Sequence, residues 1–269
     1  MKYTILALTF LFSCSTIQRN KEKPESLTNY YKENHIKEYQ TFEYDYKFGQ
    51  VDSSTKKLVE HFFFDSLGRN TKRIFYQERY ETFKGYFLDT QVVIIDFSEF
   101  ASSRTVKLYS GRMGGDLRLS DKETFDEQDR LIESVTYDST GDMEEKSVVK
   151  WNGEEYTKVN YDKFGDLKSK YTQGPSIEKL TTKDGGIDYE MKLISTSGDT
   201  KTFERTDTSG IEKIVIKQNK SIYEWKLFDS LGQEKYGSVA KVENGLAIER
   251  ISFTQREPKV FTRFVYTKY

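Results

Sequence analysis

The sequence has few of the residues on which most catalytic and metal sites depend. Among its 269 residues are 1 cysteine, 2 histidines and 3 prolines. A single cysteine excludes a disulfide within the chain. No HExxH, CxxC or DxDxDG motif occurs, so neither a metal nor another cofactor is expected. A basic surplus is also absent, because 42 Lys and Arg balance 43 Asp and Glu, and this balance argues against nucleic-acid binding.

The chain has one long apolar run, at its N-terminus. Residues 3–12 read YTILALTFLF, which is too short to span a bilayer but fits the hydrophobic region of a signal peptide. The run ends in Leu11-Phe12-Ser13-Cys14, which resembles the lipobox of bacterial lipoproteins. The resemblance implies a signal peptide over 1–13, a diacylglycerol on the Cys14 thiol and, because Ser15 is not acidic, export to the outer membrane. An ordinary cleaved signal or a buried core segment is the alternative.

Residues 14–39 are expected to form the lipidated cysteine and a tether. The stretch 15–24 is polar and charged, as is typical of a linker. Ser26 is a candidate N-cap for a short helix over 27–39.

From residue 40 to residue 269 the pattern favours β-strands. The segments 187–193 (IDYEMKL) and 223–227 (YEWKL) alternate apolar with charged residues, which predicts antiparallel strands with one dry and one solvated face. With 19 Tyr and 19 Phe the chain has ample apolar area to bury. We expect less than about a tenth of this part to be helical, far below the globular average.

Turn signals divide this region at a nearly constant spacing. Asp-x-x-Gly turns and one Asp-Gly-Gly turn follow one another at intervals of 22 to 24 residues, and a second set lies between them. Aspartate can bond its own backbone in such a turn, and glycine accepts a positive φ at its exit. The spacing predicts an all-β antiparallel meander of hairpins about 22 residues long, in an open or curled sheet, with the two sets of turns at opposite edges. The domain is expected over 40–269, as an irregular lobe (40–124) and a regular one (125–269).

Three of these turns, and a separate copy in the less regular N-terminal half, resemble the YD-repeat hairpins of the Rhs family. Each has an aromatic residue, then Asp-x-x-Gly and a polar residue: Phe64–Arg69, Tyr137–Asp142, Tyr161–Asp166 and Phe228–Gln233. The resemblance implies repeated β-hairpins. The family has no catalytic residues within its repeats, so the resemblance assigns none here.

Few residues stand out as chemical candidates. His35 and His61 lack the surroundings of a nucleophilic triad, and no catalytic residue is assigned. Trp151 and Trp225 lie in strands beside lysines and are the candidates for a carbohydrate- or peptide-binding face, with a structural core role as the alternative. The turn aspartates would bind calcium only if several stacked on one edge.

Three functions remain open from the sequence. The first is a non-enzymatic envelope lipoprotein that binds a protein or glycan partner and faces the periplasm or the cell surface. The second is a glycan-active enzyme that uses a carboxylate pair. The third is a small outer-membrane β-barrel, whose alternating strands would cross the lipid.

Overall fold

The computed structural model describes residues 31–81, 85–97, 102–110, 115–128 and 130–269, which are almost entirely β-strand. A helical turn at 31–33 and the 3-10 helix η2 (Ser53–Thr55) are the helical elements among these residues. Within the described part no helix is long and apolar enough to cross a membrane. The strands are β1 (Ile36–Lys47), β2 (Gln50–Val51), β3 (Lys57–Phe64), β4 (Asn70–Glu81), β5 (Gly85–Phe97), β6 (Ser103–Ser110), β7 (Asp116–Phe125), β8 (Leu131–Asp138), β9 (Met143–Asn152), β10 (Glu155–Asp162), β11 (Leu167–Gln173), β12 (Ile177–Thr182), β13 (Ile187–Ser197), β14 (Thr200–Asp207), β15 (Gly210–Gln218), β16 (Ile222–Phe228), β17 (Glu234–Glu243), β18 (Leu246–Thr254) and β19 (Glu257–Lys268).

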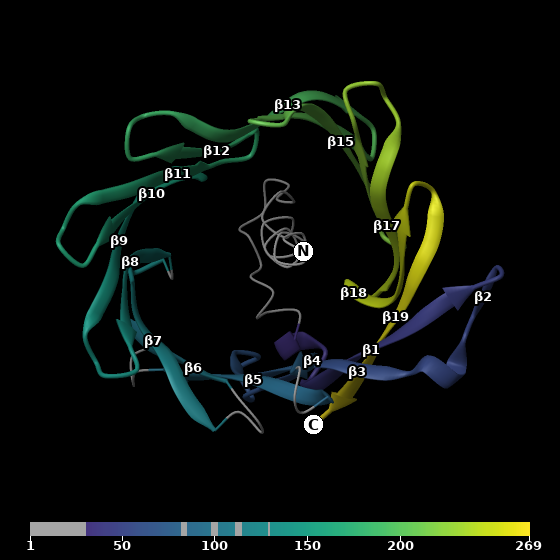
Figure 1. Ribbon diagram of the computed structural model, residues 1–269, viewed down its shortest axis with the longest axis horizontal. Helices are drawn as coiled ribbons and strands as arrows, with labels where there is room; N and C mark the ends of the chain where they lie inside the picture. The colour runs from purple at the N-terminus through teal and green to yellow at the C-terminus, as the bar shows by residue number, and fades with distance from the viewer. Residues whose placement is uncertain (1–30, 82–84, 98–101, 111–114, 129) are drawn as a thin grey trace.

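The strands form one antiparallel meander that closes on itself. From β3 to β19 each strand pairs with the next, and β1 pairs with both β19 and β3. The two-residue β2 pairs only with the end of β1, so the closed wall has 18 strands. Figure 1 shows the resulting ring. The antiparallel meander is therefore confirmed, but the expectation of an open or curled sheet is wrong. Pairing of the two terminal strands satisfies the backbone groups that an open edge would expose.

The start of the described chain identifies the inner face of the wall. Residues 31–33 lie on the inner side of the ring (Figure 1). The Tyr31 ring stacks on Phe64, with ring centroids 4.1 Å apart. Following the register from Phe64 around the barrel shows that all the buried side chains except Phe261 share this face. The inner face is therefore the one that holds the apolar clusters.

Two apolar clusters lie on the inner wall. One consists of Met191, Phe203, Ile214 and Ile216 from β13 to β15, with Leu193, Tyr223, Trp225 and Leu227 packed against it. The other lies where the barrel closes and joins Ile36, Phe62 and Phe64 to Tyr31, Tyr39, Phe75, Leu246 and Tyr266. The second cluster stabilises the seam, because it links residues near both ends of the described chain.

The outer face carries charged pairs in the middle of its strands. Lys192 and Lys179 lie 2.6 and 3.6 Å from the Glu190 carboxylate, between β12 and β13. Similar pairs join Lys146 to Glu133 (2.8 Å) and Arg263 to Glu249 (3.2 Å). Each of these residues lies at least two positions inside its strand, in the part of the wall that a lipid-facing barrel covers with its apolar band.

The turns have the predicted chemistry. Gly141, Gly165 and Gly232 have φ values of +93°, +86° and +75°, and the aspartate three residues earlier accepts backbone N–H groups of its own turn. The two sets of turns lie at opposite ends of the barrel, because successive antiparallel strands alternate in direction.

The N-terminal segment differs from its prediction. Strand β1 begins at Ile36, so the helix expected over 27–39 ends before it and the sheet starts four residues earlier than residue 40. Residues 36–39 extend because they pair with β19 and β3 at the seam. Cys14 and the segment 1–30 lie outside the described residues.

Candidate functional site

One row of the inner wall brings together aromatic, amide and charged side chains from seven strands. Its members are direct cross-strand partners from β9 to β15, so they share one face of the wall. We call it the lumenal row; it consists of Trp151, Tyr156, Gln173, Glu178, Met191, Arg205 and Glu212.

Aromatic rings form the first part of the row. The centroids of Trp151 and Tyr156 are 4.8 Å apart, and those of Tyr156 and Tyr171 are 5.9 Å apart. The Trp151 Nε1 donates to the Leu131 carbonyl at 2.9 Å, and the Arg130 guanidinium lies 5.4 Å from the indole centroid. These contacts fix the indole against the inner wall.

Glu178 is the central polar residue of the row. Its side chain belongs to a residue that is only 6% exposed. The Tyr189 hydroxyl donates to Oε1, whereas Oε2 is buried and has no hydrogen-bond partner among the described residues. A buried carboxylate oxygen without a donor is costly. Beside it, the Tyr156 hydroxyl donates to the Gln173 Oε1 at 2.6 Å.

The phenols around Glu178 are held in their neutral form. Burial raises the pKa of Tyr156 to about 12, and the nearby charge of Glu178 adds to this rise. Burial also raises the pKa of Tyr171 and Tyr189 well above the ordinary value, and Glu178 again contributes. All three hydroxyls therefore remain hydrogen-bond donors at physiological pH.

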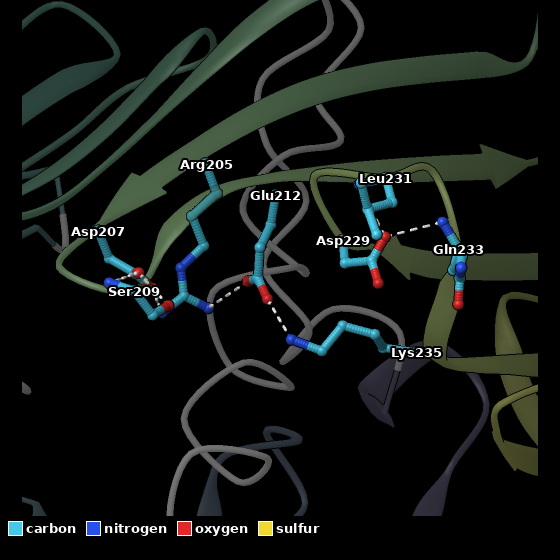
Figure 2. A network of polar contacts seen from close by, with 8 residues as sticks. All are labelled: Arg205, Asp207, Ser209, Glu212, Asp229, Leu231, Gln233 and Lys235. Atoms are coloured by element: carbon cyan, nitrogen blue, oxygen red, sulfur yellow. Dashed lines mark hydrogen bonds and ion pairs between the residues drawn. The ribbon is translucent and has the colours of Figure 1, made fainter.

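Charged groups form the other end of the row (Figure 2). The Arg205 guanidinium lies 3.1 Å from the Asp207 carboxylate and 4.0 Å from that of Glu212. Lys235 Nζ donates to the same Glu212 at 2.8 Å. Arg205 also lies 5.5 Å from the Tyr189 ring centroid. The network therefore links the row to the start of β17.

A pocket of about 520 Å³ opens beside this network, at the end of the barrel. Its lining includes the turn residues Asp229 and Gly232, together with Lys235 and Arg256. The Asp229 Oδ1 accepts the backbone N–H groups of Leu231 and Gln233 (Figure 2). The aspartate is thus committed to its turn.

A separate buried charge cluster lies at the seam. Burial raises the pKa of Glu60 on β3, and the neighbouring Arg250 partly opposes this rise. Burial likewise lowers the pKa of Arg250, which donates to the Thr262 hydroxyl at 3.4 Å. This cluster bridges β18, β19 and β3, and its position indicates a role in closing the barrel.

The sequence candidates occupy different places. Trp151 lies in the lumenal row, whereas Trp225 packs on the apolar cluster of β13–β15. His61 pairs with Glu38 at 3.0 Å, and the His35 carbonyl accepts the Tyr269 N–H at 2.9 Å. Among the described residues, no group of three or more His, Cys, Asp or Glu side chains could hold a metal ion. Sequence reasoning missed Glu178 and its tyrosines, whose grouping depends on strand register.

No known protein family matches the chain, and no curated protein matches it. Among solved structures it is similar to a porin-like protein from Bacteroides uniformis ATCC 8492, at 8% identity and a TM-score of 0.43, covering 86% of this chain and 98% of that one. It is also similar to a chain of the TcdB2–TccC3–Cdc42 structure, at 9% identity and a TM-score of 0.21, covering 82% of this chain and 13% of that one. The YD-repeat resemblance therefore rests on the turn residues alone.

Proposed function

We propose that the barrel binds a carbohydrate in its lumen without cleaving it. The observation that carries the proposal is the Glu178 carboxylate, with one oxygen bonded to Tyr189 and the other buried without a donor. A sugar hydroxyl would supply that donor, and the flat face of a sugar ring packs on aromatic rings such as those of Trp151 and Tyr156. A wall of 18 strands encloses more space than its own side chains fill.

Binding without cleavage is favoured by the spacing of the carboxylates. The second carboxylate of the row, Glu212, lies three strands from Glu178. At about 4.8 Å per strand this is about 14 Å, more than the roughly 5–9.5 Å that separate the two acids of glycosidases. The glycan-active enzyme therefore has less support than a binding protein.

Tryptophan fluorescence tests this proposal. A panel of soluble oligosaccharides from bacterial and plant cell walls is titrated into the protein, and we expect at least one to change the emission of Trp151. Glu178→Gln should weaken its binding at least about tenfold, because a hydrogen bond to a charged group contributes about 1.5–3 kcal/mol. Glu190→Gln, on the outer face of the adjacent strand, is the matched control and should bind normally. Equal effects of both variants, or no response to any sugar, would count against the proposal.

An outer-membrane pore is the second candidate. It is supported by the closed sheet and by strands of up to 13 residues, which are long enough to cross a bilayer. The charged pairs of the outer face oppose it, because Lys or Arg at the mid-plane of a lipid-facing wall costs about 2–4 kcal/mol each. We therefore favour a barrel that stands at the outer membrane, held by a lipid on Cys14, and is not inserted in it. Partition between detergent and water separates the two: without its acyl chains the favoured barrel stays in the aqueous phase, and the inserted pore enters the detergent phase.

A further inference from the structure

Lys158 lies on the inner wall and forms no ion pair among the described residues. It follows Tyr156 by two residues on β10, so its side chain shares the inner face with the lumenal row. Its direct cross-strand partners are Val149 on β9, which is only 6% exposed, and Tyr171 on β11. Lys158 itself is half-buried. A half-buried ammonium group without a counter-ion favours the approach of an anion.

The two acidic residues on the inner face of β9 and β10 have other partners. The Glu145 carboxylate on β9 accepts a hydrogen bond from Lys168 Nζ. On β10, Asp162 Oδ1 accepts two backbone N–H groups of its own turn, both at 2.9 Å. Neither acid of these described strands pairs with Lys158, so its positive charge is available to a ligand.

A chain of hydrogen bonds crosses the same inner face next to Lys158. Ser147 Oγ donates to Asn160 Oδ1 at 2.9 Å, and Asn160 Nδ2 donates to Ser169 Oγ, also at 2.9 Å. The three residues are direct cross-strand partners on β9, β10 and β11. Because the Ser169 oxygen accepts in this chain, its own O–H can donate elsewhere, as can the second N–H of the Asn160 amide. This part of the wall therefore presents hydrogen-bond donors to a ligand.

Acceptors and donors are thus separated on the wall. The lumenal row presents an acceptor, Glu178 Oε2, whereas Lys158, Asn160 and Ser169 present donors. Lys158 lies two strands from Glu178 and one inward-facing position further along its strand. At about 4.8 Å per strand and about 3.4 Å per residue, the two backbone positions are about 12 Å apart. Neighbouring units of one oligosaccharide can therefore contact both groups, with a hydroxyl that donates to Glu178 and a carboxylate that accepts from Lys158.

We propose that the lumenal site prefers an acidic saccharide, with the carboxylate of a uronic acid unit bound by Lys158, Asn160 and Ser169. This inference rests on the proposed function, because it names the class of sugar that the same site binds. A singly charged carboxylate matches one lysine and two neutral donors. Phosphate groups, in contrast, are commonly bound by the bidentate fork of arginine.

Matched acidic and neutral sugars test this preference. Oligosaccharides of galacturonic, mannuronic and glucuronic acid are compared with their methyl esters, which keep the sugar ring and lose the charge. In the tryptophan fluorescence titration we expect at least one acid to bind at least about tenfold more tightly than its ester. Sodium chloride should weaken the binding of the acid and leave that of the ester unchanged, because salt screens charged pairs.

Variants of Lys158 identify the group responsible for the preference. Lys158→Met should weaken binding of the acid at least about tenfold while the ester binds as before, whereas Lys158→Arg should keep the preference. The matched control is Lys170→Met, on the outer face of the neighbouring strand β11, which should bind both sugars like the parent chain. Thermal melting checks that each variant is folded.

Failure of this inference can be distinguished from failure of the proposed function. The preference is overturned if esters bind as tightly as acids, or if Lys158→Met weakens both equally, while Glu178→Gln still weakens binding in the lumen. It is also overturned if Lys170→Met has the same effect as Lys158→Met. If neither acids nor esters nor any other sugar binds, the proposed function is wrong and this inference is wrong with it.

Discussion

Tyr189 and Glu178 are joined by a hydrogen bond across strands β13 and β12, which leaves the second oxygen of the carboxylate buried without a partner among the described residues. The two residues are not directly opposite in register: Tyr189 pairs with Leu180, and Glu178 with Met191. The bond is therefore diagonal, and it holds the carboxylate on the inner wall in a fixed orientation.

Loss of this bond should destabilise the protein. Tyr189→Phe leaves both oxygens of a buried carboxylate without a donor, which costs about 1–3 kcal/mol in the free energy of unfolding. Urea denaturation measures the change. Tyr161→Phe, on the outer face of β10, is the control and should change stability little. If the two variants lose the same stability, the Tyr189 hydroxyl has no special role.

The features of the fold that depend on residues close together in the chain could be predicted from the sequence. The Asp-x-x-Gly spacing and the alternation of residues such as Tyr189 and Lys192 specify strands, turns and their order, because these depend on neighbours in the chain. Closure could not be predicted in this way, because it depends on β1 pairing with β19 at the far end of the chain and on the accumulated twist of all the strands.

The candidate site could be predicted from the sequence only in part, because its composition depends on which residues of neighbouring strands lie opposite one another. Trp151 alternates with Lys150 and Asn152 and could be assigned to one face of its strand. Glu178 could not, because the short strand Ile177–Thr182 places Glu178 and Lys179 side by side and both look solvated. Only the register with β11 and β13 shows that Glu178 faces the lumen and Lys179 the outside.

Glycine at the turn exits should be hard to replace. Gly232 has a φ of +75° and Gly165 of +86°, and a β-branched residue in that region costs about 1–3 kcal/mol. Gly232→Val and Gly165→Val should each lower the free energy of unfolding by that amount. Space is not the cause, because a Cβ at either glycine would meet nothing within 4 Å. Ser230→Val in the same turn as Gly232 should cost less, and an equal cost would show that φ is not the reason.

The turn aspartates should act without a metal. Asp229 Oδ1 accepts two backbone N–H groups at 3.0 and 2.9 Å, so Asp229→Ala should cost about 0.5–1.5 kcal/mol as lost hydrogen bonds. We expect the melting temperature to be the same with and without EDTA. A melting temperature that EDTA lowers in the wild type but not in Asp229→Ala would instead indicate calcium bound at the turns.

Acid should remove the stability that two other turns provide. The Arg130 side chain bonded to Asp126 lowers the pKa of that carboxyl, and the Thr140 hydroxyl does the same for Asp138. A carboxyl with a lowered pKa in the folded state contributes stability above its unfolded pKa of about 3.9, and this contribution is lost as the pH falls through the folded pKa. The urea concentration at the midpoint of unfolding should therefore fall as the pH is lowered below about 4. The double variant Asp126→Asn, Asp138→Asn should have a lower midpoint at neutral pH, and its midpoint should decrease less on acidification. A decrease as steep as that of the wild type would contradict the assignment.

Anchoring by Cys14 is the prediction that concerns the N-terminus. The apolar run 3–12 ends where a signal peptide would be cleaved, and the only cysteine of the chain follows directly. In cells fed a labelled fatty acid we expect the wild-type chain to carry the label and to sediment with membranes. Cys14→Ser should abolish the label, because no other thiol can accept the lipid, whereas Ser15→Ala should retain it. The barrel comprises residues 36–268, so Cys14→Ser should melt at the same temperature as the wild type. A label that persists in Cys14→Ser would exclude lipidation at this residue.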